Sequence, residues 1–231
     1  MASGSESSSE TTGEVKAVRR RILALAGIVE SVFADAVLAM ADADSSVVRD
    51  VRREDYRAHK VWLDTDSLCV ELLEKGQLEA GQARYIAAAI RIAVDLKQMA
   101  DKAMCIPRYM KACPEDGIPS GPWTDVLSRM AEIGEGMLSS SLECLANRDA
   151  AGARALHLVS RESSSLNSQL IQQVNHGLAS GRLQPQVGTA LVLAGNALEQ
   201  ISQYALDVAN QVRRLYAGEE PPGEPQEEAA P

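Results

Sequence analysis

The chain has 231 residues, of which 45% are hydrophobic and only 3% aromatic, and its formal net charge is −9 at pH 7. Ala, Leu and Val supply the apolar content, which favours helices over sheets. The negative charge argues against a nucleic-acid-binding protein, because such binding needs a concentrated basic surface. The four cysteines form no CxxC pair, which indicates free thiols and a reducing, intracellular compartment.

Both ends of the chain are predicted to be disordered tails. Residues 1–13 and 218–231 are rich in Ser, Glu, Pro and Gly, and they lack the apolar side chains whose burial offsets the entropy of ordering. No apolar run is expected to reach the length of a bilayer span, and the first residues do not resemble a secretion signal. The sequence therefore predicts a cytoplasmic protein.

Three helices are predicted in the first half, because apolar residues recur three and four positions apart. The first covers residues 15–43, Asp44 can cap the second, and Gly76 ends the second. The third covers residues 78–106 and stops at Pro107. Their expected apolar stripes are Ile22, Leu25, Val29, Val32, Ala36 and Met40 in the first, Val48, Val51, Ala58, Trp62, Cys69 and Leu72 in the second, and Ile86, Ile90 and Val94 in the third.

A Pro- and Gly-rich loop at residues 108–122 separates this half from a second set of three helices. Trp123 opens the fourth helix, whose apolar positions have the same spacing. Asp149 is expected to cap the fifth helix and Gly181 to end it. The sixth is predicted over residues 183–216. The apolar stripe of the fourth helix is Val126, Met130, Ile133 and Met137.

The two halves repeat one another. "LEKGQL" at residues 73–78 matches "LASGRL" at 178–183, and "DLKQMADKA" at 95–103 matches "ALEQISQYA" at 197–205. Equal helix lengths and shared motifs indicate an internal repeat, and each three-helix unit needs a partner to cover its apolar stripe. The predicted fold is all-α, a tandem pair of three-helix bundles. The domains are a first bundle at 14–107, a linker at 108–122 and a second bundle at 123–217.

Charged residues stand on otherwise apolar stripes at one place in each half. In the first half these are Lys97 and Asp101 on the third helix and Asp55 and His59 on the second. Buried charges are costly unless they are paired or bind a metal, so the four side chains are expected to meet between the two helices. The equivalent positions in the second half are Ser160, Ser164, Glu199 and Gln203.

This pattern resembles the PhoU family of phosphate-uptake regulators. "LKQMAD" at residues 96–101 and "LEQISQ" at 198–203 are similar to a family motif of the form LERIGD. "DADSSVVRDVRRED" at 42–55 and "VRRLYAGEE" at 212–220 are similar to two further family segments. The resemblance spans residues 15–219 and implies tandem three-helix bundles.

In the family, clusters of acidic side chains resemble multinuclear iron or zinc sites. The resemblance transfers the metal-ligand role to Asp55, Asp101 and Glu199. Lys97 departs from the pattern most, because an ammonium group repels a cation, and an ion pair with Asp101 one turn away is the favoured alternative. We therefore expect no cofactor. The remaining departures from the acidic pattern are His59, Ser160, Ser164 and Gln203.

The resemblance implies a regulatory adaptor that is not an enzyme and that limits phosphate-starvation signalling. Its implied partners are a phosphate-sensing histidine kinase and the ATPase of a phosphate ABC transporter, and a homodimer is a further expectation. The chain carries no GxxxxGK[ST] phosphate-binding loop. Two alternatives remain: a metal-free adaptor for another transporter, and a carboxylate-bridged metalloprotein. The second is disfavoured because no Glu-x-x-His occurs, and His157 and His176 are expected to be exposed or capping residues.

Overall fold

The computed structural model describes residues 3–41, 45–114 and 118–216, with side chains for residues 11–40, 54, 56–114 and 118–216. All of the regular secondary structure in these ranges is helical, which confirms the predicted class. The six helices are α1 (Ser3–Ala41), α2 (Ser45–Lys75), α3 (Ala80–Met110), α4 (Pro122–Asn147), α5 (Ala150–Ala179) and α6 (Pro185–Tyr216).

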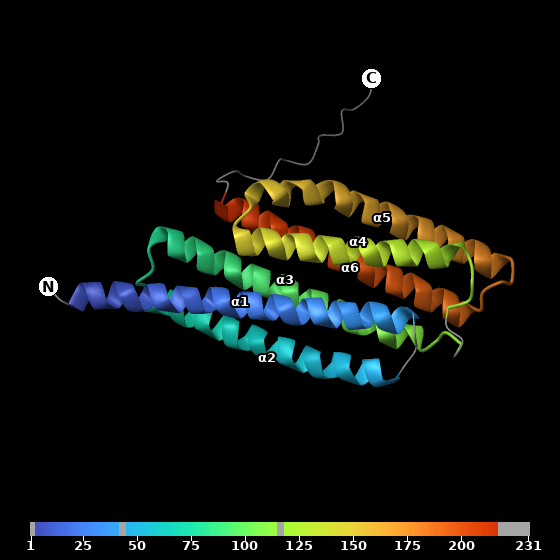
Figure 1. The fold of residues 1–231 in the computed structure, drawn as a ribbon, viewed down its shortest axis with the longest axis horizontal. Coiled ribbons are helices and arrows are strands. Elements are labelled where there is room, and N and C mark those ends of the chain that lie inside the picture. The colour runs from blue at the N-terminus through green and yellow to red at the C-terminus, as the bar shows by residue number, and fades with distance from the viewer. Residues whose placement is uncertain (1–2, 42–44, 115–117, 217–231) are drawn as a thin grey trace, which may run out of the picture.

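The helices form two three-helix bundles that lie side by side (Figure 1). In the first bundle α1, α2 and α3 all contact one another, and α4, α5 and α6 do the same in the second. The bundles meet chiefly through α3 and α6, with a smaller contact between α1 and α4. The outer helices α2 and α5 therefore lie on opposite edges of the molecule, and each contacts only its own bundle.

Burial of the apolar stripes follows the prediction in α1 and α4. In α1 the five predicted residues from Ile22 to Ala36 are buried and Met40 is half-buried, and in α4 all four predicted residues are buried. In α2, Ala58, Cys69 and Leu72 are buried, whereas Trp62 is partly exposed.

The predicted stripe of α3 is wrong at Val94 and lies at the edge of the buried face at Ile90. Ile90 is half-buried and Val94 is exposed. Because α3 packs against α1, α2 and α6, its buried face is wide, and the small side chains on it allow neighbouring helices to approach closely. The residues buried on this face are Ile86, Ala88, Ala89, Ile92, Ala93, Leu96, Met99, Ala100, Ala103, Ile106, Pro107 and Met110.

Two of the predicted helix ends and one cap are confirmed. Gly76 and Gly181 adopt positive φ angles of 63° and 71°, a conformation that glycine adopts without a steric penalty where a helix ends. The side chain of Asp149 accepts hydrogen bonds from the backbone N–H groups of Ala151 and Gly152 at 3.0 and 2.9 Å. Asp44 lies outside the described residues.

The N-terminal tail differs from the prediction, because α1 begins at Ser3 and continues through the segment that was expected to be disordered. The last part of that segment has packing partners that composition does not reveal. Thr11 is buried, and the Gln82 side-chain amide donates to the Thr12 hydroxyl at 3.4 Å. The predicted tail at 218–231 lies outside the described residues.

The third helix also runs further than predicted, through Pro107 to Met110. A proline inside a helix removes one backbone hydrogen bond, but Pro107 and Met110 are both buried in the core, and this packing offsets the loss. The connection between α3 and α4 is consequently shorter than the predicted loop at residues 108–122. The indole N–H of Trp123 donates to the carbonyl of Pro119, in this connection, at 2.8 Å.

One segment, Thr11–Met40 in α1, is long and apolar enough to cross a membrane. This differs from the expectation that no such segment exists. The apolar stripe of α1 is buried against the other helices, and the core helix of a soluble bundle passes the same test of length and composition. The segment is therefore weak evidence for a membrane span.

Candidate functional site

The polar residues of the first bundle form an ion pair on α3. The Lys97 ammonium group donates to the carboxylate of Asp101, one turn further along the same helix. The Lys97 side chain is only 12% exposed, whereas that of Asp101 is 46% exposed. The ion pair that the four-residue spacing of Lys97 and Asp101 predicted is thus confirmed, and it lies at the edge of the core.

The expected meeting of α2 and α3 through His59 is wrong. His59 is exposed, and its ring lies 5.4 Å from the ring of Trp62 on its own helix. Ala58, the preceding residue, is the one that is buried, and neighbouring positions on a helix point about 100° apart. The side chain of Asp55 lies outside the described side chains.

In the second bundle the polar layer centres on Asn167, which the sequence prediction missed. Asn167 lies on α5 and is buried. Its side-chain N–H₂ donates to Asn196 Oδ1 at 2.9 Å and to the Glu199 carboxylate. The signal in the sequence was its spacing of seven residues from Ser160, which places both residues on one face of a helix.

The serines of α5 lie in a different register from the predicted one. Ser160 is buried and its hydroxyl donates to Gln203 Oε1 at 3.4 Å, although Gln203 itself is exposed. Ser164 is exposed, so its predicted inward position is wrong. Ser163 takes that place and donates to the Ser202 hydroxyl at 3.3 Å. The inward-facing polar residues of α5 are therefore Ser160, Ser163 and Asn167, which are three and then four residues apart.

The two histidines of α5 differ in their surroundings. His157 is half-buried and its Nε2 lies 3.1 Å from Asn210 Oδ1, so the expectation of an exposed or capping residue is wrong for it. His176 is exposed, and its backbone carbonyl accepts from Ser180 at the end of α5, which confirms the expectation.

The described residues do not fit a multinuclear metal site. Among them no group of three or more His, Cys, Asp or Glu side chains could hold a metal ion. Asp101 is paired with an ammonium group, and Glu199 accepts a hydrogen bond from the neutral amide of Asn167. Both arrangements lack the concentrated negative charge that binds such cations.

We expect the purified protein to unfold at the same temperature with and without a strong chelator, within about 2 °C. The physical reason is that ion-pair and amide contacts replace metal ligands in the described polar layers. Thermal melts followed by circular dichroism check this, with manganese and zinc added back as a control. A large loss of melting temperature on chelation would contradict it.

Lys97→Glu is expected to lower the free energy of unfolding by about 1–2 kcal/mol, because it removes the cation that pairs with Asp101 and replaces it with a partly buried like charge. Arg91→Glu is the matched control, since Arg91 is an exposed cation on the same helix. Urea unfolding measures both. Equal effects of the two substitutions would show that the ion pair contributes nothing.

Two carboxylates, Asp95 on α3 and Asp207 on α6, influence one another between these helices, and the sequence prediction missed them. Burial raises the pKa of Asp95 to about 7, and the negative charge of Asp207 adds to this shift. Burial likewise raises the pKa of Asp207, while Arg214 opposes the change. Both carboxyl groups, at the interface where the bundles meet, therefore hold a proton more tightly than an exposed aspartate does.

A buried guanidinium group lies near the C-terminal end of α6. Arg213 is 1% exposed, and its Nε and Nη2 find no hydrogen-bond partner within the described ranges. Near the same end, Arg19 donates to the carbonyl of Ala146 at 2.8 Å, and the Arg148 guanidinium lies 5.6 Å from the centre of the Tyr216 ring. These contacts connect α1, α4 and α6.

Comparison with known proteins places both bundles in one family. The PhoU domain matches residues 22–109 and 127–212. The chain is 28% identical to a phosphate-specific transport system accessory protein PhoU homolog of Pseudomonas aeruginosa, over 91% of this chain and 87% of the relative. It is 23% identical to the phosphate-specific transport system accessory protein PhoU of Escherichia coli, over 84% of this chain and 80% of the relative.

The fold agrees with solved structures of the same family. The crystal structure of PhoU from Pseudomonas aeruginosa superposes with a TM-score of 0.83 at 25% identity, over 90% of this chain and 99% of that chain. A phosphate transport system regulatory protein PhoU from Streptococcus pneumoniae shares the fold with a TM-score of 0.80 at 18% identity, over 90% and 98% of the two chains. Because the domain matches cover most of both bundles, the chain belongs to the PhoU family.

Proposed function

We propose that this protein is a cytoplasmic accessory regulator of phosphate uptake, and that it restrains phosphate-starvation signalling when phosphate is plentiful. The observation that carries the proposal is the match of both bundles to the PhoU domain. Relatives that align with most of the chain are named as accessory proteins of the phosphate-specific transport system.

The regulator acts through contacts with other proteins rather than through chemistry of its own. Its partners are a phosphate-sensing histidine kinase and the ATPase of a phosphate ABC transporter. The inner faces of α3 and α6 are occupied by the contact between the bundles, so partners bind to outward-facing surfaces. The connection between the bundles is one such surface, because loops held by rigid helices commonly carry recognition.

The regulator works without a bound metal, in contrast to a carboxylate-bridged metalloprotein. Support comes from Lys97, a cation at a position where an acidic ligand was expected, which pairs with Asp101, and from the neutral Asn167 amide that donates to Glu199. The same contacts hold the polar layers without an added cation.

The test is a deletion of the gene, with expression of a phosphate-starvation reporter measured in phosphate-rich medium. Expression is expected to rise in the deletion strain and to return to the parental level when an intact copy is supplied. Unchanged reporter expression would overturn the phosphate role and favour an adaptor for another transporter.

A further inference from the structure

The last turns of α6 contain a buried cation with an unused hydrogen-bonding edge. Arg213 is 1% exposed, and its Nε and Nη2 have no hydrogen-bond partner among the described residues. The N–H groups on these two atoms point in nearly the same direction, and together they form the edge with which a guanidinium group binds two oxygen atoms at once. A buried charge without such a partner is costly. The Arg213 edge therefore has the form of a binding group for an oxyanion.

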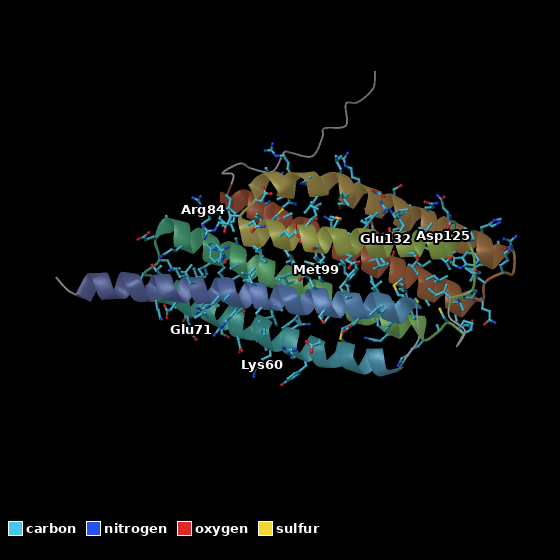
Figure 2. All side chains as sticks on the ribbon, viewed as in Figure 1. Lys60, Glu71, Arg84, Met99, Asp125 and Glu132 are labelled. Carbon is cyan, nitrogen blue, oxygen red and sulfur yellow. The ribbon has the colours of Figure 1, made fainter. Side chains whose placement is uncertain are left out.

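Further cations lie at the same end of the molecule, where α4 and α6 end and α3 begins (Figure 1). Tyr216 follows Arg213 by three residues on α6, so their side chains are neighbours on the helix surface. The Arg148 guanidinium lies 5.6 Å from the centre of the Tyr216 ring. Figure 2 shows Arg84 at this end of the molecule as well. Guanidinium groups from different elements therefore surround the end of α6.

The surroundings of Tyr85, near the start of α3, show that these cations act on one place. Burial raises the pKa of the Tyr85 hydroxyl group to about 12, and the neighbouring Tyr216 adds to the rise, whereas the guanidinium groups of Arg19 and Arg148 oppose it. Arg19 on α1 donates to the carbonyl of Ala146 at 2.8 Å, which holds it close to the end of α4. Positive charge from α1 and from the residue after α4 thus converges on two tyrosine side chains.

We propose that this basic cluster is a binding site for a small tetrahedral oxyanion, and that inorganic phosphate occupies it. The residues of the cluster are Arg19, Tyr85, Arg148, Arg213 and Tyr216. Phosphate accepts hydrogen bonds from Nε and Nη2 of Arg213, and the charges of Arg148 and Arg19 add to the attraction. The formal net charge of the chain is −9, so the positive charge at this end is local and attracts anions to this place alone.

A carboxylate and a phosphate can both use the Arg213 edge, and the arrangement of the cations favours the phosphate. A carboxylate presents its two oxygen atoms along one edge, which a single guanidinium group satisfies. A phosphate carries more than one negative charge near neutral pH, and its oxygen atoms point in four directions, so cations from several elements act on it together. Carboxylates are also present in the chain itself, in the glutamates of residues 218–231, and the experiment must distinguish this source.

Entry of the ligand requires a movement at the end of α6. Arg213 lies close to Tyr216, the last residue of the helix, and the ends of helices fray. Arg148 is exposed and Tyr216 is half-buried, so solvent reaches the groups beside Arg213. Bound phosphate then stabilises the last turn, because it supplies the partner that the buried guanidinium group lacks.

This inference goes beyond the proposed regulatory role and does not depend on it. Binding is measured on the purified protein, whereas the role is measured in a deletion strain. A purified protein that binds no phosphate leaves the regulatory role intact, and unchanged reporter expression leaves the binding site intact.

The first test is a calorimetric titration of the purified full chain with sodium phosphate, in buffer free of phosphate and sulfate. The parent is expected to bind with a dissociation constant below about 1 mM. Arg213→Met is expected to weaken binding at least about tenfold, because a hydrogen bond to a charged group contributes at least this factor. Arg214→Met is the matched control, since Arg214 is an exposed cation at the next position, and it is expected to bind as the parent does. A parent that does not bind, or equal weakening by the two substitutions, would overturn the proposal.

The second test is the melting temperature of the same proteins. Phosphate at tenfold excess over its dissociation constant is expected to raise the melting temperature of the parent by about 3–5 °C, relative to sodium chloride at the same ionic strength. In phosphate-free buffer Arg213→Met is expected to melt at or above the temperature of the parent, because it removes an unpaired buried charge. A variant that melts well below the parent in this buffer would show that Arg213 has a structural partner, and the proposal would fail.

The third test distinguishes the two sources of the oxyanion. All glutamates of residues 218–231 are replaced by glutamine in the full chain, and the calorimetric titration is repeated. If free phosphate is the occupant, this variant is expected to bind phosphate as the parent does. If the variant binds phosphate at least about tenfold more tightly, carboxylates of the chain itself fill the site in the parent, and the assignment to phosphate is wrong.

Discussion

Leu198→Ala is expected to lower the free energy of unfolding by about 3–4 kcal/mol, within the range of about 2–5 kcal/mol found when a buried leucine is truncated to alanine. Leu198 lies on α6 and is completely buried. Because α6 contacts α3, α4 and α5, the surrounding side chains are held by three neighbours and have little freedom to close the cavity. Urea unfolding monitored by circular dichroism measures the loss.

Leu193→Ala on the same helix is the control, because Leu193 is exposed. We expect it to cost less than about 1 kcal/mol, as is usual for exposed positions. The Leu198 variant is also expected to unfold in one transition, since the contact between α3 and α6 joins the bundles. Equal costs for the two leucines would contradict the packing described for α6.

Asp95→Asn is expected to stabilise the protein above pH 7 and to change little near pH 4. Burial raises the pKa of Asp95 from 3.8 to about 7 in the folded state. The folded state therefore holds the proton more tightly than the unfolded chain does, and the parent loses stability as pH rises from about 4 to about 7. After allowing for partial solvent exposure, the gain at pH 8 is about 1–2 kcal/mol.

The measurement is the free energy of unfolding at several pH values for the parent and for Asp95→Asn. Glu135→Gln, at an exposed position on α4, is expected to follow the pH profile of the parent. If the difference between Asp95→Asn and the parent does not grow between pH 4 and pH 8, Asp95 is not buried against Asp207 as described.

The fold could be predicted from sequence where one apolar stripe dominates a helix. In α1 and α4 the apolar positions recur at three and four residues with polar residues between them, so only one face can be buried. In α3, alanines lie on several faces of the helix. The prediction therefore followed the larger residues Ile90 and Val94, although the buried face is made largely of smaller residues. Only the packing of α3 against three other helices determines which face is inside.

The polar layers show the same limit. The Lys97–Asp101 pair could be predicted because a spacing of four on a helix brings side chains together whatever the neighbours are. The layer around Asn167 could not be predicted, because the run of serines in α5 allows either Ser163 or Ser164 to face inward. The choice of Ser163 over Ser164 depends on which side of α5 faces α6, and the spacing within α5 carries no such information.

The most direct test of the central claim is the initial rate of radiolabelled phosphate uptake by cells grown in phosphate-rich medium. If the protein is an accessory regulator that limits uptake, the rate will be higher in a strain lacking the gene. An intact copy will restore the parental rate, and the Leu193→Ala variant will do so equally. Identical rates in the parent and the deletion strain would contradict the account.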